Sequence, residues 1–291
     1  MSPFTKQAIS YIGTTLSLIG LIFIALKLYS YGAVAIFSGY SIFDWTAISG
    51  LVLVYTLANI LLSIAWWHIL SGLGINVSYY WAVRTYAISQ ITKYLPGNIF
   101  QFVGRQALGM AKGLPAWLLA KSSFLEILFM AFCCTIFGVF LLPVFINSNY
   151  INVWICLLFF LLIFSSVFII INKYLNPKFI NALLCYIGFL IISSLLFLTL
   201  IFLQNKSFGV VDVSNIFILC SAYIVAWLIG LITPGAPAGV GIRELVLFFI
   251  LKGLVKESDL LAVVFLGRLI TIGGDVIFYL LGVFFISDEN K

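Results

Sequence analysis

The sequence predicts an all-α polytopic membrane protein, and two features of its composition support that prediction. Of the 291 residues, 64% are hydrophobic and only 8% are charged, whereas a soluble domain typically carries about 25% charged residues. The apolar residues gather in repeated stretches of about 20, which is the length a helix needs to cross the hydrocarbon core of a bilayer. Membrane-spanning β-strands would give short alternating segments instead, so we expect helices.

A single transmembrane domain is expected over residues 1–291, with about six full spans and two helical hairpins that re-enter the membrane. The full spans are predicted at residues 8–29, 45–70, 115–142, 149–172, 179–203 and 257–286. The first is interpreted as an uncleaved span, because its apolar run is longer than the core of a signal peptide. Lys and Arg in the short loops slightly favour a cytoplasmic location for both termini.

Two further regions, 79–112 and 212–252, do not have the pattern of simple spans. Each contains a helical run, a Pro-Gly break and a second short run that ends at a Lys-Gly pair. Proline blocks continuation of a helix, and glycine relaxes the backbone. Each region is therefore predicted to be a broken, re-entrant hairpin.

The two broken regions share the same order of features. The corresponding pairs are Pro96-Gly97 with Pro234-Gly235, Arg105 with Arg243, Lys112-Gly113 with Lys252-Gly253, and Glu126 with Arg268. Repeat 1 would then cover about 79–142 and repeat 2 about 212–286. Three full spans separate the hairpins, so we expect them to enter from opposite faces as inverted repeats. Paired interruptions of this kind point to a transporter site.

Each break should create a helix N-terminus that attracts an anion. Its N–H groups are unpaired and carry a partial positive charge, and in lipid they need partners. Phosphate suits such a helix end, and arginine binds phosphate bidentately. Arg105 and Arg243 each follow a break, so we expect both near a site for a phosphate-bearing head group. The alternative is that the breaks are kinks, with Arg243 paired to Glu244 or to a neighbouring helix.

The candidate substrate-binding residues are the charges within apolar segments and the residues of the two breaks. They are Arg105, Arg243, Arg268, Glu126, Glu244, Pro96, Gly97, Asn98, Pro234, Gly235, Gly239 and Gly241. Charges at membrane depth are costly and tend to face the interior. Because Glu126 and Arg268 occupy matching positions, we expect them to pair across the two halves, as a functional or a structural salt bridge. Asp275 and Lys93 are candidates for coupling transport to protons.

Several classes of site are not expected. The five cysteines lie in apolar runs without metal-ligand spacing, and His68 is the single histidine, so neither a metal site nor a histidine-containing catalytic triad is predicted. The net charge is +6, but no basic cluster is dense enough for nucleic acid. We expect no cofactor and no catalytic residue.

Two motifs carry a resemblance to a known family. KYLPGNIFQFVGRQ (93–106) and TPGAPAGVGIRE (233–244), with the later LGRL (266–269), resemble the lysylphosphatidylglycerol synthase transmembrane-domain family, which includes the flippase domain of MprF and the YbhN-like proteins. Ile127 stands where the family often has the Arg of a Glu-Arg pair, and Pro237 interrupts the usual Gly-Gly. The resemblance implies lipid translocation in a bacterial or archaeal cytoplasmic membrane, without the aminoacyl-transferase domain.

We therefore expect the protein to flip a lipid with an anionic head group, either a phospholipid or a polyprenyl-phosphate-linked sugar. Three alternatives stay open. The first is an integral membrane transferase acting on polyprenyl phosphate, with Glu244 or Asp275 as its acid/base. The second is a small-anion channel or transporter, and the third is a noncatalytic membrane partner of a glycosyltransferase. The expected partner is membrane lipid, and the oligomeric state is not predicted.

Overall fold

A computed structural model describes the fold over residues 40–95, 99–146, 152–204 and 213–284. Every regular element within these ranges is a helix, so the predicted all-α fold class is confirmed. The expected span at 8–29 lies outside the described residues, as do Pro96, Gly97 and Asn98 of the first break.

Six of the described helices are long and apolar enough to cross a membrane, which confirms a polytopic membrane protein. They are α3 (Ile42–Gly72), α6 (Ala116–Gly138), α8 (Val153–Tyr174), α9 (Lys178–Gln204), α10 (Val213–Ile232) and α12 (Glu257–Phe284). The short elements η2 (Val139–Leu141) and α7 (Leu142–Ile146) continue α6. Five of the six coincide with predicted full spans. The sixth, α10, has the length of a span but belongs to the second broken region.

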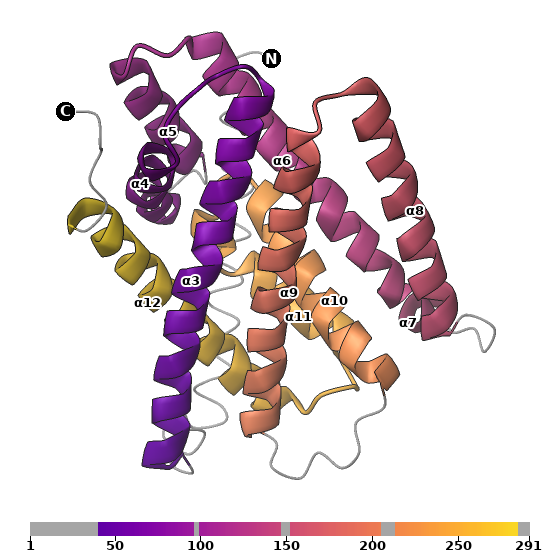
Figure 1. The fold of residues 1–291 in the computed structure, drawn as a ribbon. Helices are drawn as coiled ribbons and strands as arrows, with labels where there is room; N and C mark the ends of the chain where they lie inside the picture. The colour runs from indigo at the N-terminus through magenta and orange to yellow at the C-terminus, as the bar shows by residue number, and fades with distance from the viewer. Residues whose placement is uncertain (1–39, 96–98, 147–151, 205–212, 285–291) are drawn as a thin grey trace, which may run out of the picture.

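The two hairpins are built alike and enter the bundle from opposite ends. The first consists of α4 (Tyr79–Gln90), η1 (Ile91–Tyr94) and α5 (Phe100–Ala111), and the second of α10, η3 (Pro237–Gly239) and α11 (Ile242–Ile250). In Figure 1, α3 ends and α6 begins at the upper end, whereas α10 and α12 both begin at the lower end. The arrangement agrees with the inverted hairpins expected from the sequence.

Local signals in the sequence set where two of the helices begin. At the start of α3, the Ser41 backbone N–H donates to the Asp44 carboxylate at 2.8 Å, and the Asp44 N–H donates to the Ser41 hydroxyl at 3.2 Å. This reciprocal capping box satisfies two N–H groups that the first helical turn leaves open. Ser78 caps α4 with a single hydrogen bond, because its hydroxyl accepts from the Trp81 N–H at 3.3 Å.

Helices α3, α9 and α12 form the centre of the bundle, and the two hairpins pack around them. Large side chains from all three are fully buried, among them Trp66, Tyr186, Phe189 and Phe278. By contrast, α8 lies at the periphery in Figure 1, and most of its side chains are exposed. The second break and the described parts of the first hairpin thus lie next to this centre.

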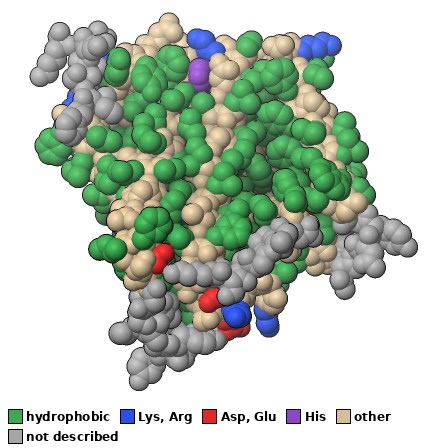
Figure 2. Space-filling model, turned by 60° about the horizontal axis from the view of Figure 1, so that its bottom comes forward, with side chains coloured by type: hydrophobic (Ala, Val, Ile, Leu, Met, Phe, Trp, Pro, Cys, Tyr) green, Lys and Arg blue, Asp and Glu red, His purple; other side chains and the backbone are tan. Residues whose placement is uncertain are grey.

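The surface has the polarity expected of a protein embedded in a bilayer. Figure 2 shows a broad hydrophobic face, with Lys and Arg side chains at its upper end and Lys, Arg, Asp and Glu side chains toward its lower end. The apolar band between the charged ends is the part of the surface that suits contact with lipid tails.

The second break is held together by a close approach of two glycines. Gly239 has a φ of +68°, and a Cβ atom at this position would lie 2.7 Å from the Gly230 Cα in α10. No side chain other than hydrogen fits between the two backbones, so α10 and the loop that follows it can touch. The glycines of this break are therefore required by packing as well as by backbone conformation.

Replacing Gly239 with alanine should lower the thermal midpoint of the detergent-solubilised protein more than replacing Gly74 with alanine. Gly74 also has a positive φ, of +82°, but nothing lies within 4 Å of its Cβ position. Gly74→Ala therefore reports only the backbone strain, about 1–2 kcal/mol, whereas Gly239→Ala adds a steric clash. Equal midpoints for the two variants would show that the close approach does not contribute to stability.

Candidate functional site

A cavity in the bundle is lined by residues of both hairpins, and its empty space, which includes space open to solvent, is about 640 Å³. The element η1 of the first hairpin contacts η3 of the second. Lys93 and Tyr94 of η1 line the cavity from one side, and Ala238, Arg243 and Arg268 of repeat 2 line it from the other. The structure thus brings both hairpins to one site, which the spacing of the motifs alone did not establish.

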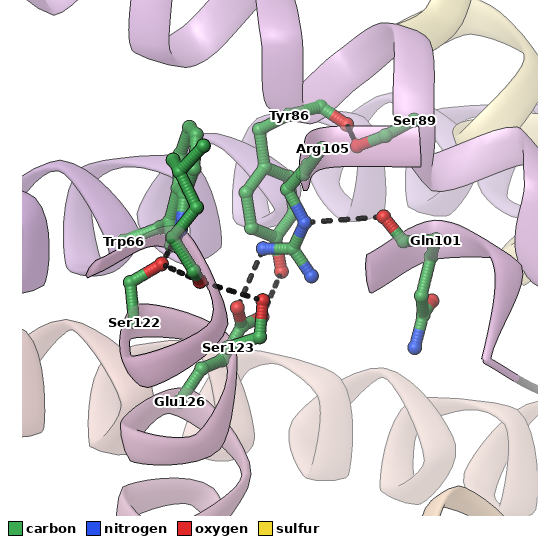
Figure 3. Close-up of polar contacts among 9 residues, drawn as sticks. Trp66, Tyr86, Ser89, Gln101, Arg105, Ser122, Ser123 and Glu126 are labelled. Atoms are coloured by element: carbon green, nitrogen blue, oxygen red, sulfur yellow. Dashed lines mark hydrogen bonds and ion pairs between the residues drawn. The ribbon is translucent and has the colours of Figure 1, made fainter. Parts of the chain in front are cut away.

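Arg105, on the second arm of the first hairpin, is 1% exposed and bonded to protein groups through two of its guanidinium nitrogens (Figure 3). Its Nη1 lies 2.5 Å from the Glu126 Oε2, and the Tyr86 hydroxyl donates to the other carboxylate oxygen at 2.9 Å. The guanidinium carbon also lies 4.2 Å from the centre of the Tyr86 ring and 5.1 Å from that of Phe102. Glu126 lines the cavity, but Arg105 does not, so Arg105 supports the site from behind.

Arg268 of α12 holds the second break in place. It forms an ion pair with Glu244 of α11, and its two terminal nitrogens donate to the Ala238 and Gly239 carbonyl oxygens at 3.1 Å and 3.0 Å. These carbonyls lie in the irregular loop between α10 and α11, where no helix supplies donors. One guanidinium therefore neutralises a buried carboxylate and also satisfies the open backbone of the break.

The expected pair between Glu126 and Arg268 does not form, because each residue pairs within its own repeat. In repeat 1 the second arm of the hairpin carries the cation, Arg105, and the following span carries the carboxylate. In repeat 2 the order is reversed, since Glu244 is on the arm and Arg268 is on the span. Both pairs are therefore local, and neither residue has a charge left for the other half.

Arg243 has no ion-pair partner among the residues that the structure describes. Adjacent residues on a helix point in different directions, so Glu244 faces Arg268 and not its neighbour. The Arg243 Nη2 donates to the Tyr223 hydroxyl at 3.2 Å, and its guanidinium lies 5.4 Å from the centre of the Tyr223 ring and 6.0 Å from that of Trp227. The side chain passes over Gly230 and borders the cavity.

Lys93 and Asp275 form a third pair, and this pair joins the two halves of the protein. The Lys93 Nζ lies 2.7 Å from the Asp275 Oδ2. The Tyr94 hydroxyl donates to the same oxygen at 2.5 Å, and the Asn59 amide donates to Oδ1 at 3.1 Å. Asp275 is 0% exposed, so three partners surround it and fasten the tip of the first hairpin to α12. Both residues proposed for coupling thus belong to one contact.

The charges around the cavity do not balance. Lys93, Arg105 and Arg268 are each paired with one carboxylate. The fourth cation, Arg243, is left over in the described part of the chain. The site therefore carries one net positive charge, located on a side chain that borders an open volume.

The remaining candidate substrate-binding residues of the second break shape its backbone and do not line the cavity. Gly235 and Gly241 are buried in the second break and, like Gly239, have a positive φ, whereas Pro234 is exposed. The described residues contain no group of three or more His, Cys, Asp or Glu side chains that could hold a metal ion.

Sequence reasoning missed the polar and aromatic lining that surrounds these charges. Gln90 and Gln101 lie on either side of the first break, and Tyr55, Tyr86 and Trp227 also line the cavity. The two glutamines were visible as polar residues in helices that otherwise have few, on arms that flank a Pro-Gly break. The sequence therefore shows the two glutamines next to the break, but it does not show which face of each helix meets the cavity.

Replacing Arg105 with methionine should strongly destabilise the protein, because it leaves the Glu126 carboxylate buried without a cation. Breaking a buried pair costs about 3–5 kcal/mol, whereas replacing both partners with apolar residues is often neutral. The double variant Arg105→Met/Glu126→Met should therefore recover most of the lost thermal midpoint in detergent.

The matching double variant Arg268→Met/Glu244→Met is the control. This double variant should recover less of the lost thermal midpoint, because Arg268 also donates hydrogen bonds to two carbonyl oxygens of the second break. Equal recovery of the two double variants would contradict the structural role assigned to Arg268.

Comparisons with known proteins give no relative from which a role could be transferred. A scan of the chain against protein-family models finds no match, and a search of the curated proteins finds none either. The geometry of the site is therefore the basis for any functional assignment.

Proposed function

We propose that the protein is a translocator and not an enzyme, and that it moves a lipid with an anionic head group between the two leaflets of a membrane. The lipid would be a phospholipid or a polyprenyl-phosphate-linked sugar. Its head group would pass through the central cavity while its tail stays in the bilayer. The observation that carries this proposal is the unpaired cation Arg243 at the cavity.

An unpaired arginine at this depth calls for an anion. A charged side chain within the membrane costs about 2.5–3.5 kcal/mol on insertion scales. The other three cations of the site offset that cost with carboxylates, but Arg243 has only a hydroxyl and two aromatic rings nearby. A phosphate group would supply the missing charge and could bind the guanidinium with two hydrogen bonds.

The start of α11 supports the same conclusion. Arg243 is the second residue of this helix, where the helix dipole disfavours a cation. No side chain caps the helix at Gly241. An anion bound next to Arg243 would reverse the unfavourable interaction with the dipole and would also suit the open N–H groups of the first turn.

The surroundings of the cavity favour a lipid over a small soluble anion. Apolar and aromatic side chains, including Leu62, Phe102 and Met130, line much of the cavity. A lone inorganic anion would leave this apolar surface without contacts, whereas a larger head group would fill it.

The two motifs in the breaks extend the proposal to family and location. On the resemblance of 93–106 and 233–244 to the lysylphosphatidylglycerol synthase transmembrane-domain family, we place the protein in a bacterial or archaeal cytoplasmic membrane with both termini in the cytoplasm.

Replacing Arg243 with glutamine should slow lipid movement at least about tenfold, which is the effect of losing one hydrogen bond to a charged group. The measurement uses the purified full chain in phosphatidylcholine vesicles that contain fluorescent phosphatidic acid, with dithionite quenching of the outer leaflet as the readout. Arg243→Lys should keep part of the rate, because it retains the charge but loses the bidentate geometry.

Lys121→Gln is the matched control, since it removes a cation from an exposed position that does not line the cavity. Unchanged movement in Arg243→Gln would contradict the proposal. Flux of chloride without any movement of lipid would favour an anion channel. If neither lipid nor chloride moves, the transferase and the partner of a glycosyltransferase become the better hypotheses.

A further inference from the structure

The lining of the cavity differs between its two sides. Repeat 2 contributes Arg243, the cation without an ion-pair partner in the described part of the chain, and Arg268, which is paired with Glu244. The first hairpin contributes the carboxamides Gln90 and Gln101 together with aromatic rings such as Phe102. Lys93 also lies on the first hairpin, but Asp275 neutralises it. The cavity therefore has a cationic side and a side that is neutral, polar and aromatic.

The two carboxamides on the neutral side are buried without hydrogen bonds. Gln90 and Gln101 are each only 6% exposed. Within the described ranges, neither side-chain amide donates to or accepts from another group, and only the backbone oxygen of Gln101 is used, by Arg105. Figure 3 shows the Gln101 amide pointing away from Arg105. Both residues line the cavity, and their amide atoms are not among the fully enclosed side-chain atoms without a partner, so a ligand in the cavity can reach them.

The chemistry of a carboxamide limits which ligand groups can form hydrogen bonds with both its oxygen and its nitrogen. Each has an oxygen that accepts and a nitrogen that donates two hydrogen bonds. Unprotonated phosphate oxygens only accept, and an ammonium group only donates, so neither satisfies both ends of a carboxamide. Hydroxyl groups donate and accept. The net positive charge of the site also disfavours an ammonium group, and flat aromatic surfaces suit the apolar face of a ring.

We propose that the head group carries a hydroxyl-rich ring next to its phosphate, with the phosphate at Arg243 and the ring at Gln90 and Gln101. This inference rests on the proposed function and makes it narrower. The substrate class is a lipid whose phosphate is linked to a sugar or to a cyclic polyol. Gln90 and Gln101 are specificity-determining residues, since they contact the part of the head group that other anionic lipids lack.

The test compares three fluorescent lipids with the same acyl chains in vesicles that contain the purified full chain. Phosphatidylinositol has a phosphate and a hydroxyl-rich ring, phosphatidic acid has only the phosphate, and phosphatidylserine has an amine and a carboxylate. Wild-type protein should move phosphatidylinositol at least about tenfold faster than the other two, the equivalent of one or two satisfied hydrogen bonds.

Gln90→Leu and Gln101→Leu should each lose this advantage, so that the rate for phosphatidylinositol falls to that for phosphatidic acid measured with the same variant, and an unchanged thermal midpoint in detergent shows that each variant is folded. Gln101→Asn is a second variant that keeps the amide but withdraws it by one methylene, and the same loss is expected. Gln106→Leu is the matched control, because Gln106 lies on the same helix α5 but does not line the cavity.

The outcomes separate this inference from the proposed function. Equal rates for the three lipids, or an advantage that survives in the Gln90 and Gln101 variants, would overturn the role of the ring and leave lipid translocation standing. Movement of none of the three lipids would refute translocation and the inference with it. Faster movement of phosphatidylserine than of phosphatidylinositol would also overturn the inference, since it would assign the carboxamides to an amine.

Discussion

The hydrocarbon core of a bilayer offers no water to a buried charge or to an open helix end, and the interior of this protein depends on how those groups are satisfied. Two interrupted helices bring irregular backbone into the centre of the bundle, and that backbone must find donors and acceptors within the protein. In the second break, Arg268 supplies two donors to the Ala238 and Gly239 carbonyls and is itself held by Glu244. A single ion pair thus stabilises a loop that lipid could not accommodate.

In the first hairpin a buried arginine is also neutralised by a carboxylate. Arg105 is enclosed by Glu126 and by the rings of Tyr86 and Phe102, so its charge is shielded from the cavity. Both repeats contain a buried arginine–glutamate pair. In repeat 1 the arginine is on the second arm of the hairpin and the glutamate on the following span, whereas in repeat 2 the two residue types are reversed. Because repeat 2 uses its carboxylate for Arg268, the arginine that matches Arg105 in sequence, Arg243, is left without one and borders the open volume.

The contact between Lys93 and Asp275 links this site to the rest of the bundle. It is the point at which the tip of the first hairpin is fastened to α12, with Tyr94 and Asn59 completing the carboxylate. Any movement of η1 relative to α12 must separate these charges inside the protein, which is costly unless another ion replaces one of them. Lys93 also borders the cavity, so the contact that holds the two halves together can be reached from the cavity.

The amino-acid sequence by itself determined the helices, the breaks and the intramembrane charges, because hydrophobic length and the effects of proline and glycine are local properties. The described spans from α3 to α12 follow from apolar run length, and the counting of spans correctly placed the hairpins at opposite ends. Only the tertiary structure decided that Glu126 pairs with Arg105 and not with Arg268, and that Gln90 and Gln101 face the same cavity as Arg243. Periodicity places residues on a face of one helix, but the tilt and packing of α6, α11 and α12 determine which faces meet, and in lipid the nearest opposite charge becomes the partner.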